Sequence, residues 1–339
     1  MWFLVDMAEP DKVIRHVPKE GMARARSLHR AIRPAGLAAA AGAVIAQAAE
    51  SGQRCERAVL LRGEAHRVLA IPVPGPDGVP LAVRLWAGAS RIEPPDPPAV
   101  DAFVWDSRQW MLRTHGGGGG SVLPEGHPLL HGAWFLSRVI ECEDRDRLMT
   151  AALDPKPGVA WRGPMQVRTP GDRTARVFGF LRYHAEGALR GLLLEVAADR
   201  APGLVPATYR DDAAIALLGG TTALIDAETM QIIEWLTPPL GDIAWRHHPA
   251  SRGIDPDDDG REFTLATTHL VHPDDMDGYL GALRGLAERR SERTRVAVRL
   301  LTLRQDWQPV ELYGARLPRG LPRFLICLIR PVVSDPVPE

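Results

Sequence analysis

The chain has few cysteines and no long apolar run. Cys55, Cys142 and Cys327 are odd in number and far apart, so they fit neither a secreted disulfide framework nor the Cys-x-x-Cys spacing of a metal site. We therefore expect reduced thiols in a cytoplasmic protein. Charge at Asp6 interrupts the short apolar stretch at the start, and no segment approaches the about 18 apolar residues of a membrane span. We expect neither a signal peptide nor a membrane partner.

An excess of charge of one sign is also missing. The sequence holds 41 lysines and arginines against 42 aspartates and glutamates, a formal net charge of −1. This balance supplies no basic field for a phosphate backbone, so we expect no nucleic-acid partner. Lysine occurs only at positions 12, 19 and 156, a bias that suggests a GC-rich bacterial genome. Hydrophobic residues make up 45% of the chain, as in folded domains.

Linear catalytic motifs are absent as well. The sequence contains no Gly-x-Ser-x-Gly elbow, no His-Glu-x-x-His, no kinase signature and no Gly-Gly-Asp-Glu-Phe cyclase motif. The glycine run at 116–120 lacks the Gly-Lys-Ser/Thr ending of a phosphate loop, which favours a flexible loop. We therefore predict no catalytic residues and a protein that is not an enzyme.

The clearest organised segment is the last third of the chain. His272-Pro273-Asp274-Asp275 predicts a helix start, because proline suits the first helical position and carboxylates suit the positive end of the helix dipole. Apolar residues then recur at helical spacing. Strand-like runs lie before the helix at 222–226 and 230–236, and after it at 295–304, 310–317 and 323–330.

These elements, in the order β-β-helix-β-β-β, resemble a PAS domain. The resemblance is carried by Leu224-Ile225-Asp226 with the turn after it, by the helix start at 272–275, and by the three-stranded meander that follows. It implies a sensor module, an antiparallel sheet whose usual cavity lies under the helices. The middle strand would supply Leu312 or Tyr313 to that face, depending on register.

The same order of elements occurs twice more upstream. A long helical tract at 27–50 and helical tracts at 129–141 and 144–153 are each followed by three strand-like runs, and four prolines within 92–100 mark a linker. We therefore predict an α+β fold of three tandem PAS/GAF-like domains, each an antiparallel sheet with helices on one face. They span residues 1–92, 100–200 and 204–333, with the linker at 93–99; the first two fit either PAS or GAF.

Over nearly its full length, the chain resembles an actinobacterial family of uncharacterised proteins with three sensor domains built from PAS and GAF modules. Trp86-Ala87-Gly88, Glu93-Pro94-Pro95 and Trp105-Asp106 carry this resemblance, and it brings no catalytic residue or cofactor. It implies a non-catalytic, cytoplasmic signal-transduction protein that binds a small molecule, a partner protein or both. A protein partner is expected because no output domain is attached. An enzyme with a site between domains and a purely structural scaffold are the alternatives.

Two sequence features invite a metal or haem hypothesis. Asp255–Gly260 opens like a calcium loop, but its twelfth position would be Ala266 instead of an acid, which favours a solvated acidic turn. Histidines at 247, 248, 269 and 272 could supply imidazoles, but the helix start already accounts for His272, and surface histidines in a long loop are the favoured explanation. We predict no metal site, and no cofactor is named by the sequence.

Aromatic residues are the candidates for a ligand site. They are Trp134, Trp161 and Phe178 in the middle domain, and Trp245 and Tyr313 in the last. These side chains could line an apolar cavity or simply fill the core of a small α+β domain, and the second reading is favoured. If the last domain holds a ligand, we expect it to contact both Trp245 and the sheet near Tyr313, with the long segment 245–270 as the other wall.

Overall fold

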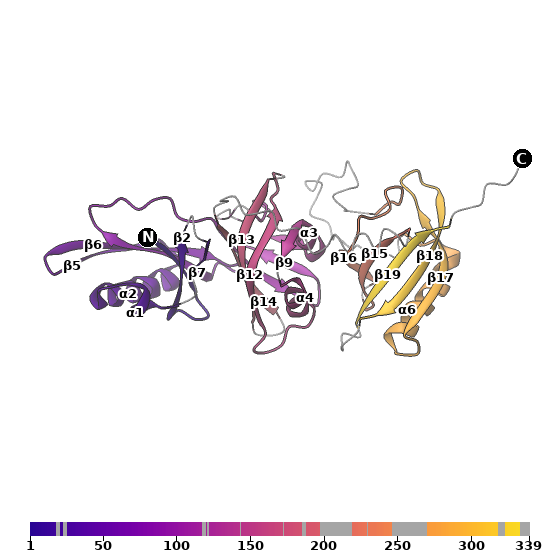
Figure 1. Ribbon diagram of the computed structural model, residues 1–339, viewed down its shortest axis with the longest axis horizontal. Coiled ribbons are helices and arrows are strands. Elements are labelled where there is room, and N and C mark those ends of the chain that lie inside the picture. Colours follow the sequence, from indigo (N-terminus) through magenta and orange to yellow (C-terminus); the bar gives the residue numbers. More distant parts are fainter. Residues whose placement is uncertain are drawn as a thin grey trace, which may run out of the picture. The chain divides into compact units, whose positions relative to one another are not determined.

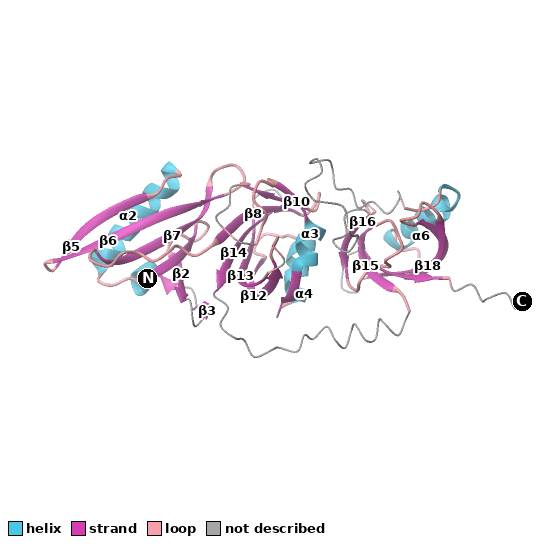
Figure 2. Ribbon diagram, turned by 90° about the horizontal axis from the view of Figure 1, so that it is seen from above, coloured by secondary structure: helices cyan, strands magenta, loops and turns pink. Residues whose placement is uncertain are grey.

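The structure is a computed structural model. It describes residues 1–17, 21–22, 26–116, 120, 122–142, 144–171, 173–184, 188–196, 219–228, 230–245, 270–317 and 323–332. The chain divides into two compact units, Met1–Leu130 with Arg138–Gly203 and His131–Ser137 with Leu204–Glu339. The described residues form three antiparallel sheets (Figures 1 and 2).

The first sheet packs one face against a helix. Its strands are β1 (Trp2–Asp6), β2 (Lys12–Val17), β3 (Gly21–Met22), β4 (Arg26–Ser27), β5 (Cys55–Leu61), β6 (Glu64–Pro74) and β7 (Pro80–Ala89), in the order β3-β2-β1-β7-β6-β5 with β4 beside β2. The helices are α1 (Leu28–Ala31) and α2 (Ala35–Ser51), and Pro34 lies between them. Small residues such as Ala41 and Ala48 on α2 are fully buried and let the helix approach the sheet closely.

The opposite face of the first sheet anchors the proline-rich linker. The Trp2 indole nitrogen donates to the Pro95 carbonyl at 2.9 Å, and an Arg84 nitrogen lies 3.4 Å from the Pro98 carbonyl. Trp86 lies beside Trp2 in the β1–β7 register, and both are buried. Trp2 and Arg84 therefore hold the segment that the prolines predict as a linker.

The second sheet also belongs to the first unit. Its strands are β8 (Val100–Asp106), β9 (Met111–Thr114), β10 (Leu129–His131), β11 (Val139–Cys142), β12 (Ala160–Arg168), β13 (Thr174–Tyr183) and β14 (Ala188–Val196), in the order β10-β9-β8-β14-β13-β12-β11. Helices α3 (Gly132–Arg138) and α4 (Arg145–Leu153) lie between β10 and β12 in the chain. The predicted helix over 129–141 is too long, because β-branched Val139 and Ile140 continue as strand, with Val139 paired to Val167.

One apolar cluster joins the two sheets of the first unit. Leu4, Ile14 and Ala82 from the first sheet pack with Val104, Leu192 and other residues of the second. Since Leu4 alternates with helix-facing Phe3 and Val5, both faces of the first sheet are buried there. This explains the run of buried residues in β1, which shows no apolar–polar alternation.

The third sheet forms the core of the second unit. Its strands are β15 (Thr221–Asp226), β16 (Gln231–Trp235), β17 (Arg293–Leu301), β18 (Trp307–Arg316) and β19 (Phe324–Pro331), in the order β16-β15-β19-β18-β17. A 3-10 turn, η3 (Pro273–Asp275), leads into α6 (Met276–Ala287), which confirms the predicted helix start. Leu283 and Leu286 of α6 pack on Leu312 and Cys327. The register thus gives the core Leu312, and not Tyr313.

The five main strands of each sheet follow the same spatial order. Numbered along the chain within each sheet, they read 2-1-5-4-3: β2-β1-β7-β6-β5, β9-β8-β14-β13-β12 and β16-β15-β19-β18-β17. The predicted antiparallel sheets are therefore confirmed, and they repeat one topology. The domain boundaries at 92, 100, 200 and 204 stay a prediction. Among the described residues, no helix has the length and apolarity to cross a bilayer.

Candidate functional site

The first unit contains a cleft of about 440 Å³. It opens where the end of β1 and the start of β2 approach β12, β13 and β14 of the second sheet. Charged side chains line its walls, and apolar side chains line its floor. The residues that line it are Asp6, Glu9, Lys12, Ile14, Leu81, Arg147, Ala160, Trp161, Arg162, Phe180, Leu181, Arg182, Arg190, Gly191 and Leu192.

Strand pairing places two arginines side by side in this cleft. Arg182 on β13 and Arg190 on β14 are direct cross-strand partners. Like charges in this position repel each other, so the pair needs a counterion. Asp6 at the end of β1 supplies one: its carboxylate accepts from the Ala8 backbone N–H at 2.9 Å, which fixes its direction, and it also binds Arg190.

Glu9 supplies the second counterion. A guanidinium nitrogen of Arg182 lies 3.0 Å from the Glu9 carboxylate and another lies 3.9 Å from Asp6, while Lys12 contacts Glu9 at 3.0 Å. Hydrogen bonds from Arg182 and Lys12 lower the pKa of Glu9 to about 2. The same pairing raises the pKa of Arg182. Glu9 and Arg182 are therefore both charged at neutral pH.

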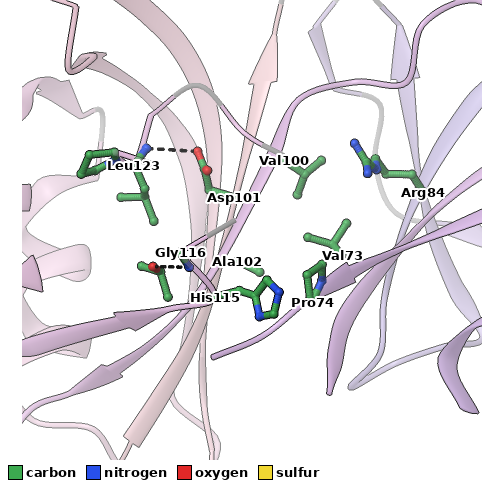
Figure 3. A pocket seen from close by; sticks show the side chains of 11 residues that line it. Val73, Pro74, Arg84, Val100, Asp101, Ala102, His115, Gly116 and Leu123 are labelled. Carbon is green, nitrogen blue, oxygen red and sulfur yellow. Dashed lines mark hydrogen bonds between the residues drawn. The ribbon is translucent and has the colours of Figure 1, made fainter. Parts of the chain in front are cut away.

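A second, smaller pocket lies in the same unit (Figure 3). Asp101 of β8 forms one side, and its carboxylate accepts from the backbone N–H groups of Val122 and Leu123 at 3.0 and 3.3 Å. Arg84 lies across the pocket, where burial lowers its pKa. The volume of about 40 Å³ suits a few water molecules and is too small for an organic ligand. Asp101 therefore holds the loop at 122–123 in place, and this pocket is not our candidate for a ligand site.

The predicted ligand residues of the middle domain are not brought together. Trp161 is buried and pairs with Leu181, and its ring lies against Gly179. Phe178 alternates with Gly179 and therefore points to the other face, where it packs on Phe180 with ring centroids 5.1 Å apart. Trp134 is half-buried on α3. Of the three, only Trp161 lines the cleft.

Trp245 and Tyr313 also lie in different environments. Trp245 is buried in the core of the third sheet, with its ring 4.7 Å from that of Trp235 and its indole N–H donating to the Leu240 carbonyl at 2.9 Å. Tyr313 follows Leu312, which faces that core, so Tyr313 points to the other side. Its hydroxyl lies 2.5 Å from a Glu311 carboxylate oxygen. That either residue binds a ligand stays a prediction.

Other sequence hypotheses lie partly or wholly outside the described residues. These are the acidic turn at 255–260, the histidines at 247, 248 and 269, residues 117–119 of the glycine run, and residues 246–269 of the long segment. Within the described ranges, no group of three or more histidine, cysteine or acidic side chains could hold a metal ion. His272 accepts from the Asp274 backbone N–H at 3.2 Å and so caps the helix start.

Sequence reasoning missed the charged residues of the cleft, although one signal was present. Arg182 and Arg190 are each four positions from Glu186, the middle of Ala185-Glu186-Gly187, whose glycine and place between two strand-like runs favour a turn. A hairpin centred on that turn places the two arginines opposite each other. The partners Asp6 and Glu9 carry no such signal, because they come from a distant segment.

Comparisons with known proteins agree with the fold. Residues 1–96 match the family model described as Rv3651-like, N-terminal. A crystal structure of an uncharacterised protein from Mycobacterium tuberculosis is similar over 98% of this chain and 96% of its own, with a TM-score of 0.65 and 19% identity. An RNA-binding light-oxygen-voltage receptor matches with a TM-score of only 0.23 and 10% identity, over 68% of this chain and 95% of its own.

No curated protein matches the chain by sequence. The mycobacterial structure shows a shared fold at low identity, and the family model covers the N-terminal domain. Both support the resemblance to an uncharacterised actinobacterial family. The chain is thus similar, in its first 96 residues, to the Rv3651-like N-terminal family and, over nearly its whole length, to an uncharacterised mycobacterial fold.

Proposed function

We propose that the chain is a non-catalytic sensor protein whose three PAS/GAF-like domains bind a small molecule, a partner protein or both. The repeated 2-1-5-4-3 strand order supports this, because one topology used three times is what tandem sensor domains require. A cytoplasmic location is part of the proposal, and the three free cysteines support it.

The cleft of the first unit is the observation that carries a ligand-binding role. Its volume of about 440 Å³ falls within the range of small-molecule pockets, roughly 300–1,000 Å³. Asp6 and Leu81 of its wall come from the first sheet, whereas Phe180 and Arg190 come from the second. A bound molecule would therefore contact both sheets and could change how firmly they hold each other.

The state of the cleft carboxylates favours binding over catalysis. A general base works best when its pKa lies near the working pH. The pKa of Glu9 is about 2, because Arg182 and Lys12 bind its charged form. Asp6 is likewise bound by Arg190. Both carboxylates act as counterions that position arginines, and an enzyme would need a proton acceptor from elsewhere.

Ligand capture followed by mass analysis tests this function. The full chain, purified from its native host, is analysed by native and denaturing mass spectrometry, and a metabolite library is screened for compounds that raise its melting temperature. We expect a bound compound that is recovered chemically unchanged. Turnover of that compound would support the enzyme alternative, and a chain that retains and responds to nothing would support a scaffold.

A further inference from the structure

The charges that line the cleft are unbalanced. Five cationic side chains face two carboxylates; the cations are Lys12, Arg147, Arg162, Arg182 and Arg190, and the carboxylates are Asp6 and Glu9. The carboxylates are already bound by Arg182, Arg190 and Lys12. These three cations outnumber the two carboxylates by one, and the rest of the surplus positive charge lies on the cleft's remaining arginines.

Arg162 and Arg147 carry that surplus. Arg147 of α4 is 72% exposed and reaches Asp144 at 3.2 Å, a weak surface pair. Arg162 of β12 is exposed, and no hydrogen bond or ion pair of its side chain is found within the described part of the chain. Its cross-strand partner is Phe180, and the residue two positions before it, Ala160, is paired with Arg182. Arg162 and Arg182 therefore lie on the same face, as diagonal neighbours on adjacent strands.

The floor beside these arginines is apolar. Phe180 pairs with Leu192 on one side and with Arg162 on the other, and Ile14 and Leu81 close the cleft from the first sheet. A guanidinium binds a carboxylate or phosphate through two parallel hydrogen bonds, and an aromatic ring offers a flat apolar contact. In this cleft, the guanidinium groups and the aromatic ring are adjacent.

We infer that the cleft binds a small organic anion, with its carboxylate or phosphate at Arg162 and Arg182 and its apolar, ring-sized body on Phe180. The inference rests on the proposed function, because it names the ligand class of the same cleft. The counterions leave the Arg182 side chain 35% exposed, so it remains accessible to a ligand. Asp6 and Glu9 hold Arg182 in position, and the surplus positive charge of the cleft disfavours cations.

The test compares two variants of one strand. Arg162→Gln removes the exposed charge at the cleft, and Arg168→Gln removes an exposed charge from the same face of β12, about 20 Å further along the strand. Benzoate and phenyl phosphate serve as anionic probes and benzamide as a neutral one, measured by isothermal titration and by saturation-transfer NMR on the full chain. We expect both anions to bind the unsubstituted chain and the Arg168→Gln variant alike, and roughly tenfold more weakly the Arg162→Gln variant.

Three results would overturn the inference: equal affinity for benzamide and benzoate, no loss in the Arg162→Gln variant, or no anion binding at millimolar concentration. Circular dichroism confirms that both variants fold, which is expected because both side chains are exposed. A neutral compound found in the cleft would refute the anion preference and leave the sensor function standing. A chain that binds no compound of any kind would refute both.

Discussion

The ion pair between Asp6 and Arg190 should be the main electrostatic contact between the two sheets of the first unit. Their side chains are only 15% and 13% exposed, so solvent screens the pair weakly. Asp6→Asn would leave Arg190 next to Arg182 without its counterion. Removing one partner of a fully buried pair costs about 3–5 kcal/mol, and for this partly solvated pair we expect about 2–3 kcal/mol.

Glu9→Gln is the matched control. Glu9 also binds an arginine of the cleft, but its side chain is 37% exposed, and we expect a loss of at most about 1 kcal/mol. Unfolding in urea, followed by hydrogen exchange of peptides from β1 and β14, reports on the first unit separately from the second. Salt should weaken the Glu9 contact more than the Asp6 contact, because screening acts mainly on exposed charges.

A double-mutant cycle decides whether the two residues interact. In the chain with both Asp6→Asn and Arg190→Gln, no unpaired charge remains from this contact. The combined loss should therefore be smaller than the sum of the single losses by at least about 1 kcal/mol. Additive losses, or an Asp6→Asn effect as small as that of Glu9→Gln, would refute the reasoning.

Other contacts lead to further predictions. Arg299 lowers the pKa of Asp275 to about 2, below its unfolded value of 3.8. The contact therefore stabilises the fold above about pH 4, and this stability is lost as the pH falls towards 2. Asp275→Asn should cost about 1 kcal/mol at pH 7, because Arg299 is 40% exposed, and should flatten the acid limb of a melting-temperature profile. Gly191→Ala should cost about 1–3 kcal/mol in urea unfolding, because a Cβ there would lie 2.1 Å from the Phe103 ring. Burial raises the pKa of Cys327 to about 12, so iodoacetamide should alkylate it only in denaturant, as peptide mass analysis would show.

Local chemistry made the element order of the third sheet predictable. The proline and carboxylates at 272–275 start the helix as expected, and Asp275 adds a contact that no pattern indicates: it accepts from the Arg299 backbone N–H at 2.8 Å and from its side chain at 2.8 and 2.9 Å. The carboxylate therefore fixes the helix start to β17 in addition to facing its dipole. The sequence could not predict which residues of the strands face the helix, because both alternate residue sets of β19 are apolar and either could have faced it.

Burial on both faces limited prediction in the first unit. β1 and β14 contain continuous apolar runs, residues 2–5 and 192–194, so alternation could not show that one face packs on a helix and the other on a second sheet. The aromatic residues chosen as ligand candidates illustrate the consequence. Trp161 and Phe178 are both large and lie on neighbouring strands, yet pleating directs them to opposite faces.

The paired arginines show how a site can be visible in sequence without a motif. Two like charges opposite each other on adjacent strands weaken a hairpin, so a chain that places Arg182 beside Arg190 must supply negative charge nearby. Asp6 and Glu9 supply this negative charge from a segment more than 170 residues away, and both carboxylates are bound by the paired arginines. Arg162, two positions beyond the partner of Arg182, has no such counterion within the described residues. The hairpin therefore accounts for the carboxylates of the cleft, and the proposed ligand accounts for the arginine that remains.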